Sequence, residues 1–568
     1  MYRIIITLTI ILTAANCGGV PARQSRTEQN GILRVADAQA ERSQFPGKEP
    51  DFAATRPRAK IRDELTIAFP QSGIELDFRK AYLTHEAQLF TAVYEGLFSY
   101  HPFTMEPVPG VAVRWSLSED KKEWTFTLRK DAKYWNGDPV TAEHFRSAWL
   151  SLLHPSRNAP YASLFDIIEG ARAYRMGEIR DPNAVGIIAP DDETLIVRLS
   201  APAAFFRSML CHHAFSPIHP AMLNKKKWSQ ETPISNGPFY IKENKPSRIT
   251  LLKNTEYWDA KSVSLNKLLL KFIEDGNEAA ALWNSGEARW IYRDVNMENL
   301  TDLSGIMLNP MFSTHYYFIR SRETPWSDHR VRRALALALP WDQLRQGYLL
   351  PATTLIYPLA GYPHIAGIEQ TDLEEARRLL ASAGYPNGTG LPVLVVRLNP
   401  SAEAARAGAL MLNAWRDNLG VPVKIEVIPY NRYEESLKQD GYGVGSTTWI
   451  GDFADPYSFL EMWRRDSTLN YARYNDAEYE TLMDRSMLEE GGKRMEILAE
   501  AEKLLLDRGA VLPIFYSPAL NIVDVDEIEG WYPNALDIHP FKYLSFKTFK
   551  PLPGVASAPG MTPAAYAP

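Results

Sequence analysis

The chain has 568 residues, of which 45% are hydrophobic and 23% charged. This composition indicates a globular protein, and the length favours several domains over one. The net charge of −6 argues against nucleic acid as the main partner, because neutralising phosphates requires clustered Lys and Arg.

The N-terminus has the pattern of a signal peptide. Arg3 supplies a positive charge, residues 4–12 are apolar apart from two threonines, and small residues precede Cys17. The apolar run is too short to span a bilayer as a stable helix, which predicts a signal peptide over 1–17. The segment resembles a bacterial lipobox, whose Cys is lipidated, although Asn16 departs from the usual Gly or Ala. Secretion with a free Cys17 is the alternative.

Two segments lack the pattern of a packed core. Residues 18–60 mix Gly, Pro, Arg, Gln and Glu without periodicity, as in a tether between a membrane and a domain. Residues 551–568 are rich in Pro and Ala and predict a disordered tail. We therefore expect the protein in the cell envelope, in the periplasmic space or on the outer face of a membrane, anchored by lipid at Cys17.

The chain has 2 cysteines, and the second is Cys211. Lipidation of Cys17 would leave no intrachain disulfide, so stability must come from packing. His212 and His213 follow Cys211, but adjacent residues rarely converge on one ion and the spaced partners of a zinc site are missing. We expect a buried Cys beside partly exposed His residues, and no metal site.

Between residues 65 and 340 short strands alternate with single helices. Apolar residues alternate in 124–129, so one face of that strand is expected to be buried. Thr141 is placed to cap one helix, and Asp328 to cap another that Pro340 stops. Further strands are predicted at 65–69, 195–199, 238–241 and 249–253, and a helix at 276–285.

From residue 371 the pattern is that of an α/β sheet. Thr371 and Glu374 predict a capping box at the start of a helix that Gly384 ends. Helices then alternate with strands, which predicts βαβ units with helices packed on a sheet. The strands are expected at 393–398, 423–427, 444–450 and 511–515, and the later helices at 402–419, 475–490 and 493–508.

The loop after the strand at 444–450 is the first candidate for a binding site. Residues 449–456 hold two carboxylates, two aromatic rings, a Gly and a Pro. The loop leaves the carboxyl end of a strand, which is where α/β sheets place ligands. Asp452 is the leading residue, although Asp-x-x-Asp-Pro also occurs in plain turns, where the Asp only caps the turn.

Catalytic motifs are absent from the sequence. It contains no HExxH, no Walker loop, no paired CxxC and no GxSxG elbow between a strand and a helix. The glycine-rich segment 441–445 precedes a strand instead of opening a helix, which is the wrong context for cradling phosphate. We therefore expect a binding protein that is not an enzyme and needs no cofactor.

Several stretches, in order along residues 65–548, resemble one family. This is the extracellular solute-binding proteins, family 5, of ATP-driven peptide importers, and within it the oligopeptide-binding proteins. The matching stretches are 108–112 with Trp115, 124–133, 135–145, 160–162, 235–239, 257–258, 328–332 and 449–456.

The resemblance implies an α/β fold of the two-lobed periplasmic-binding-protein type (class II, cluster C), with an extra inserted domain. Crossover strands would join the lobes, and hinge closure would enclose a ligand between them. Domain I would comprise 61–94, 220–312 and 522–550, the inserted domain II 95–219, and domain III 313–521.

The resemblance also implies a role for the loop. In peptide-binding members an Asp three residues after a Trp pairs with the α-ammonium group of the ligand, which here is Asp452 after Trp449. Trp449 is a ligand-binding candidate, with a core role as the alternative, whereas Asp455 is expected to keep a turn role.

Other candidate contacts come from the same resemblance. The backbone of Ile450 and Gly451, and the early loop around Thr84, would bind the peptide main chain as an added β-strand. Tyr161 would line the cleft from domain II, unless it is a core residue. Asn399, directly after a predicted strand, completes the set.

One position departs from the family. Relatives that grip the carboxyl end of a peptide often carry Arg three residues before the Trp, where this chain has Ser446. Either the ligand carboxylate is met elsewhere, for which Arg397 and Arg432 are candidates, or it is solvated, or the ligand is not a typical short peptide.

Together these features predict a monomeric receptor that captures oligopeptides and delivers them to the permease subunits of an ABC importer. One alternative is a sensor or adaptor that binds peptide signals or cell-wall fragments without import. Another is an envelope peptidase, which the missing motifs disfavour. Binding of a metal or nickel complex, known elsewhere in the family, is a further alternative.

Overall fold

The computed structural model describes residues 33–34, 62–69, 74–225, 228, 233–359 and 361–547. The predicted signal peptide with Cys17, nearly all of the tether and the C-terminal tail lie outside these residues. Within the described part, no helix combines the length and apolar character needed to cross a membrane.

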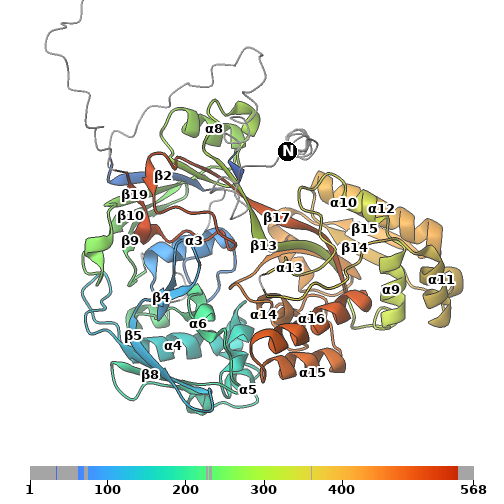
Figure 1. The fold of residues 1–568 in the computed structure, drawn as a ribbon, viewed down its shortest axis with the longest axis horizontal. Helices are drawn as coiled ribbons and strands as arrows, with labels where there is room; N and C mark the ends of the chain where they lie inside the picture. Colours follow the sequence, from blue (N-terminus) through green and yellow to red (C-terminus); the bar gives the residue numbers. More distant parts are fainter. Residues whose placement is uncertain are drawn as a thin grey trace, which may run out of the picture.

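An 11-stranded mixed sheet runs through both halves of the molecule (Figure 1). Its order is β15-β14-β16-β13-β17-β12-β2-β11-β10-β9, and β1 pairs with β13 off this path. The strands are β1 (Leu33–Arg34), β2 (Glu64–Phe69), β9 (Phe239–Lys245), β10 (Arg248–Lys253), β11 (Lys267–Phe272), β12 (Trp290–Tyr292), β13 (Ile306–Ile319), β14 (Leu394–Leu398), β15 (Val423–Val427), β16 (Val444–Ile450) and β17 (Val511–Val523).

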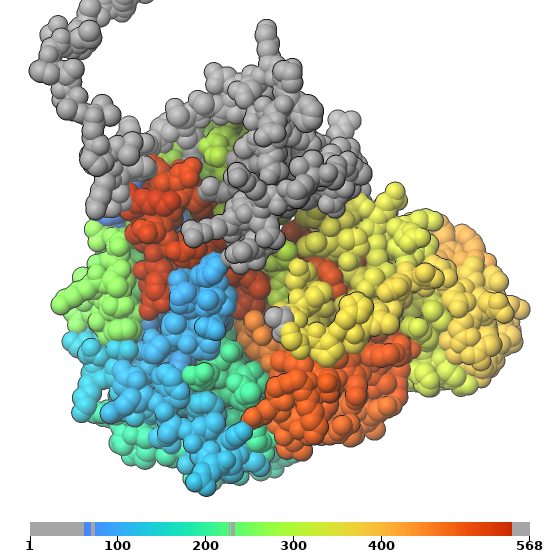
Figure 2. Space-filling model, viewed as in Figure 1, coloured from blue at the N-terminus to red at the C-terminus, as the bar shows by residue number. Residues whose placement is uncertain are grey.

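The long antiparallel strands β13 and β17 connect the two halves. β13 pairs with β16 from Ser313 onward, and β17 pairs with β12 from Asn521 onward. The strands therefore change neighbours beside 312/313 and 521/522, where we place the proposed domain limits. The predicted α/β class with two lobes and crossover strands is confirmed, and in Figure 2 the blue-to-green half and the yellow-to-orange half meet along a seam.

The pairing of the two crossover strands is interrupted near its middle. Pro310 faces Pro518, and neither can donate a backbone hydrogen bond. The register then shifts before Thr314 and again after His315. Because proline is unusual in central strands, the local sequence pattern does not predict the full length of β13 or β17. β13 was not predicted, and β17 was expected only at 511–515.

The lobe that carries β14, β15 and β16 is the predicted α/β unit. These three strands run parallel, so their carboxyl ends share one edge of the sheet. One helix cap differs from its prediction. Asp372, and not Thr371, caps the helix that begins at Leu373, by accepting from the Glu375 amide (3.0 Å). The Thr371 hydroxyl donates to the Leu339 carbonyl instead. The helices of this lobe are α9 (His329–Leu337), α10 (Trp341–Arg345), α11 (Leu373–Ser382), α12 (Ala402–Leu419), α13 (Tyr430–Leu437), α14 (Tyr457–Leu460), α15 (Ala477–Ser486) and α16 (Gly491–Asp507).

The inserted region, for which we propose the limits 95–219, has its own four-stranded antiparallel sheet, in the order β5-β6-β8-β7. It lies below the large sheet in Figure 1, beside α14, α15 and α16. Its strands are β3 (Phe98–Tyr100), β4 (Pro107–Pro109), β5 (Ala112–Leu117), β6 (Glu123–Leu128), β7 (Ile187–Ile188) and β8 (Thr194–Arg198). Its helices are α4 (Ala142–Leu153), α5 (Ala171–Arg175), α6 (Phe206–Met209) and the 3-10 turn η4 (Ala162–Ile167).

The first lobe is completed by short elements around β2 and β9 to β12. Helix α3 precedes the inserted region, and the strand pair β18-β19 comes from the C-terminal segment. The elements are α3 (Thr84–Val93), α7 (Pro220–Leu223), α8 (Gly276–Asn284), β18 (Ile528–Glu529) and β19 (Ser545–Phe546).

Candidate binding site between the lobes

The loop that follows β16 begins at Gly451. Its amide donates to the Phe312 carbonyl of β13 (2.8 Å), which extends the β13–β16 ladder by one residue. A Cβ atom on Gly451 would lie 2.3 Å from the Phe312 ring, so only glycine lets the ring pack against the strand here. The Gly451 amide is therefore engaged within the sheet.

Asp452 is buried where the inserted domain meets the α/β lobe. Its amide donates to Ser458 Oγ (2.7 Å), which fixes the loop to α14. Its Oδ1 lies 3.5 Å from His212 Nε2, and the Tyr100 hydroxyl lies 3.4 Å from its carbonyl oxygen. Its Oδ2 has no hydrogen-bond partner among the described residues. Because an unpartnered buried carboxylate is costly, this oxygen is suited to a positive ligand group.

The protonation of this site follows from its burial. Burial raises the pKa of Asp452 well above its usual value, the nearby Glu461 carboxyl adds to the rise, and the Tyr161 hydroxyl opposes it. Burial lowers the pKa of His212 well below its usual value, and His213 lowers it further. His212 is therefore neutral near pH 7 and is no counter-ion for Asp452. A cationic ligand would favour the ionised carboxylate.

The two predicted aromatic residues approach this site from different domains. Tyr161 is buried, and its ring meets His212 edge to face with centroids 4.5 Å apart. Trp449 is half-buried, and its Nε1 donates to the Ser458 carbonyl (3.1 Å). Tyr161 therefore adjoins the carboxyl, whereas Trp449 holds the residue whose hydroxyl fixes Asp452.

The carboxyl half of β16 has one open edge. Among the described strands, β14 pairs with β16 only at Val396 and Val444, whereas β13 pairs with it as far as Ile450. Alternate residues of an antiparallel strand direct their backbone groups toward and away from the partner. Because Gly451 bonds to β13, Thr448 and Ile450 direct theirs to the open edge. Ile450 is thus placed to pair with an added strand.

Asn399 and Thr84 belong to different lobes. Asn399 directly follows β14 and is half-buried, and its Oδ1 accepts from the Ser401 amide (3.1 Å). Thr84 opens α3 in the first lobe, and the turn before it is held by Glu86, which accepts from the Tyr82 amide (2.9 Å). The roles of Asn399 and Thr84 in ligand binding remain predictions.

The other end of β16 is closed by hydroxyl groups. Ser446 is buried, and the Tyr433 hydroxyl lies 3.1, 3.2 and 3.1 Å from its amide, carbonyl and Oγ. The same hydroxyl donates to the Arg397 carbonyl (3.1 Å) and so fills the gap between β14 and β16. The Arg397 guanidinium binds Glu426 (2.8 Å) and a backbone carbonyl (2.7 Å), so it is already engaged within the protein. Arg432 is exposed.

The Cys211–His213 segment differs from its prediction. His212 and His213 are buried, whereas Cys211 is partly exposed, which reverses the expected order. The two imidazole rings lie 4.1 Å apart between centroids, and His212 faces Asp452. In the described part of the chain, no group of three or more His, Cys, Asp or Glu could hold a metal ion. Nothing in the sequence near position 452 could have revealed His212, because the contact joins two domains.

Asp455 has a stronger structural role than a turn. Arg494 of α16 binds both of its carboxylate oxygens, at 2.7 and 2.9 Å, and both side chains are buried. The Tyr457 amide also donates to it (2.9 Å), and the Arg494 guanidinium lies 4.7 Å above the Phe205 ring of the inserted domain. The protein thus neutralises Asp455 internally but leaves Asp452 without a cation.

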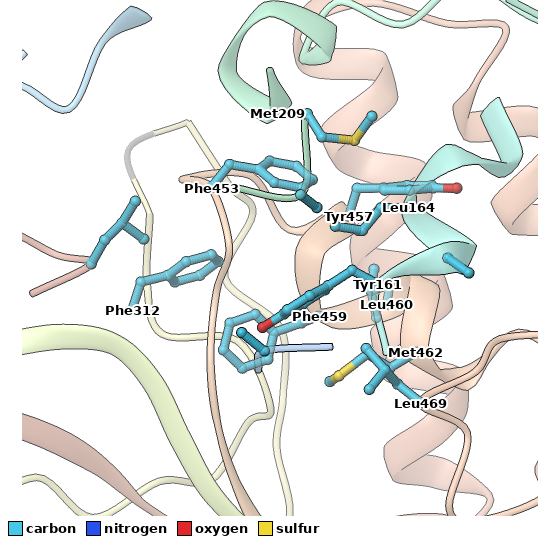
Figure 3. Close-up of a cluster of buried hydrophobic side chains, with 14 of the residues drawn as sticks. Tyr161, Leu164, Met209, Phe312, Phe453, Tyr457, Phe459, Leu460, Met462 and Leu469 are labelled. Carbon is cyan, nitrogen blue, oxygen red and sulfur yellow. The ribbon is translucent and has the colours of Figure 1, made fainter. Parts of the chain in front are cut away.

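The inserted domain packs directly on the α/β lobe beside Asp452. The Phe205 ring stacks on Phe453 and Tyr457, with centroids 5.6 and 4.8 Å apart. The Thr468 hydroxyl donates to the Pro160 carbonyl (2.7 Å). Figure 3 shows Phe453 and Tyr457 in one apolar cluster with Tyr161. These contacts enclose Asp452 between the two domains.

Comparisons with known proteins show which family this chain resembles. Residues 106–471 match the family described as "Bacterial extracellular solute-binding proteins, family 5 Middle". The oligopeptide-binding protein OppA of Bacillus subtilis (strain 168) is 30% identical over 435 residues, covering 72% of this chain and 80% of OppA.

Two solved structures of one relative are similar to this chain to different degrees. The structure of the Escherichia coli murein tripeptide binding protein MppA has a TM-score of 0.75 at 27% identity, covering 86% of this chain and 99% of that one. An MppA structure described as the unliganded open form also has 27% identity, covers 86% and 98%, and has a TM-score of 0.63. This structure is thus more similar overall to the first MppA structure than to the unliganded open form.

Proposed function

The chain belongs to the bacterial extracellular solute-binding proteins of family 5, and we propose that it captures oligopeptides between its lobes. The observation that carries the proposal is the buried Asp452 carboxyl, which has one oxygen without a partner among the described residues. It lies at the end of an open strand edge. A peptide supplies an amino terminus that can pair with the Asp452 carboxyl, and main-chain groups that can hydrogen-bond to the strand edge.

This mode of binding uses groups that all peptides share. The ammonium group would lie between Asp452 and the neutral side chains of Tyr161 and His212, and the main chain would pair with Ile450 and Thr448 of β16. Removing one partner of such a buried charge pair costs about 3–5 kcal/mol, which corresponds to about two to four decades in Kd. The oligopeptide-binding and murein tripeptide-binding descriptions of OppA and MppA support peptide ligands.

Closure of the lobes would enclose the ligand. The interrupted ladder at Pro310 and Pro518 gives both crossover strands the same weak point, because backbone hydrogen bonds are missing there. A hinge at that point would leave the pairing within each lobe intact. The closed receptor would then deliver its ligand to the permease subunits of an ABC importer, while lipid at Cys17 holds it at the membrane surface.

Calorimetry with Asp452→Asn tests the proposal. Wild type should bind unmodified tripeptides to pentapeptides, a murein tripeptide among them, and the variant should lose about two to four decades in affinity. Asp417→Asn is the matched control, because Asp417 is an exposed carboxylate that pairs with the neighbouring Arg416. Equal affinity of wild type and Asp452→Asn would refute the pairing of Asp452 with the peptide's amino terminus. If cleaved peptide is recovered from the calorimeter cell, the peptidase alternative is indicated.

A further inference from the structure

A short segment of the α/β lobe, residues 466–468, docks on the inserted domain beside Tyr161, and we call it the latch. The Thr468 hydroxyl donates to the Pro160 carbonyl (2.7 Å). The buried Ser163 hydroxyl lies 3.1 Å from Thr468 Oγ1 and is the donor of that bond, since the Thr468 proton is already donated. Pro160 and Ser163 lie on either side of Tyr161, so Thr468 fixes the turn that carries this ring.

Asp466, at the other end of the latch, adds charged contacts to a second part of the inserted domain. Its carboxylate pairs with Arg172 of α5, and its carbonyl oxygen accepts from Arg175 Nη2 (2.7 Å). Arg175 Nε also donates to Asp166 of η4 (2.7 Å), and the Arg175 side chain is only 6% exposed. Because η4 begins directly after Tyr161, these bonds join α5, η4 and the Tyr161 turn to the latch.

The inserted domain is attached to the first lobe by a separate set of bonds. The Trp135 amide donates to the Ser235 carbonyl (3.0 Å), and its Nε1 donates to the Pro233 carbonyl (3.0 Å). Arg79, in the segment before α3, donates to Ser151 Oγ of α4 (3.0 Å). The inserted domain would therefore move with the first lobe when the crossover strands bend, and opening of the cleft would break the latch contacts.

Another polar contact across the same seam is more exposed. Lys121, in the turn between β5 and β6, binds Glu490 directly before α16 (2.8 Å), and the two side chains are 51% and 53% exposed. An ion pair in water contributes little, because solvent and salt screen its charges. The latch instead includes the buried Ser163 and the nearly buried Arg175. The better shielded of these polar contacts therefore lie beside the candidate site.

Resting on the proposed function, we propose that Thr468 and Asp466 are positioning residues that control how long a peptide stays bound. They hold the turn with Tyr161, whose ring packs on His212, against the lobe that carries Asp452. The amino-terminal site is then complete only when the lobes are closed. Because a peptide first meets the open form and leaves only after opening, the latch acts on the dissociation rate and not on association.

Dissociation kinetics of the double variant Thr468→Val/Asp466→Asn test the inference. The complex with radiolabelled tetra-alanine is mixed with an excess of unlabelled peptide to measure dissociation, and calorimetry gives Kd, from which the association rate constant follows. We expect the dissociation rate constant to rise about tenfold, because two hydrogen bonds and an ion pair are lost. The association rate constant should change by less than about twofold, so Kd should rise by about the same factor as the dissociation rate constant.

Asp466→Asn alone should give the same division between the two rate constants with a smaller effect. Thr481→Val/Asp507→Asn is the matched control, because the Thr481 hydroxyl bonds within α15 (2.8 Å) and Asp507 pairs with Lys503 within α16. If dissociation is unchanged, if the control changes it equally, or if only association slows, the inference is wrong while Asp452-dependent binding stands. Failure of wild type to bind any peptide would overturn the proposed function and this inference together.

Discussion

The two ends of the open β16 edge offer a ligand different groups. At Asp452 the protein buries a carboxyl oxygen that has no hydrogen-bond partner among the described residues, with the neutral ring of His212 beside it. At Ser446 the amide, carbonyl and side-chain oxygen are each in contact with the Tyr433 hydroxyl. The Asp452 end is thus suited to a positive ligand group, whereas the polar groups at the Ser446 end already have partners within the protein.

This difference indicates how a peptide would be held. A ligand fixed by its amino terminus keeps the same register on β16 whatever its length. Its carboxyl end would remain solvated or reach the exposed Arg432, since Arg397 is engaged by Glu426. Ser446, which carries no charge, therefore predicts tolerance of ligand length at that end.

The largest effect we expect comes from blocking the ends of the ligand in turn. N-acetylation removes the positive charge opposite Asp452 and should raise Kd by about two to four decades. Amidation of the carboxyl end should change Kd by less than about threefold, because Ser446 offers that end no charge. Calorimetry of one tetrapeptide in its free, acetylated and amidated forms measures both effects. A loss on amidation as large as that on acetylation would show that the two ends are equivalent.

A smaller effect is expected from Tyr433→Phe. The variant leaves the buried Ser446 amide and Arg397 carbonyl without the hydroxyl that meets them, at a cost of about 1–3 kcal/mol in the free energy of unfolding. Peptide affinity should change by less than about threefold, since the Tyr433 hydroxyl stabilises the fold and does not bind a charged group of the ligand.

Urea unfolding and calorimetry of the same preparation measure both quantities for Tyr433→Phe. Tyr430→Phe is the control, because Tyr430 starts the same helix and is 64% exposed. A large loss of affinity with unchanged stability would instead place Tyr433 among the ligand contacts.

Elements with a local sequence pattern were predicted, whereas elements that depend on distant partners were not. The α/β lobe was predicted closely, since strands such as β16 at Val444–Ile450 and helices such as α12 follow local periodicity and caps. The crossover strand β13 was missed, because Pro310 interrupts its pattern and its partners lie far away in the sequence.

The candidate site divides in a similar way. Asp452 was reached from its place after a strand and from the resemblance of its loop to a family. His212 and Tyr100 were not, because their contacts join separate domains and leave no local pattern. Even the different roles of Asp452 and Asp455 depend on Arg494, which belongs to a distant helix.

The smallest effect concerns the stability of the unliganded protein. Burial raises the pKa of Asp452, so the folded protein binds this proton more tightly than the unfolded chain does. The stability that results is complete below the unfolded pKa of about 3.9 and is lost as the pH rises through the raised folded pKa. Asp452→Asn has no proton to lose there. We therefore expect its free energy of unfolding, relative to wild type, to increase as the pH rises from about 4 to about 8.

Urea unfolding at several pH values, without peptide, gives this difference. Glu461, whose pKa burial raises to about 7, and His212 titrate in both proteins, so their contributions largely cancel when the two are subtracted. A variant that is less stable than wild type at every pH would mean that the protein itself holds the Asp452 carboxylate, as Arg494 holds that of Asp455. In that case the two ends of β16 would both be internally satisfied, and the ligand charge would have to be recognised elsewhere.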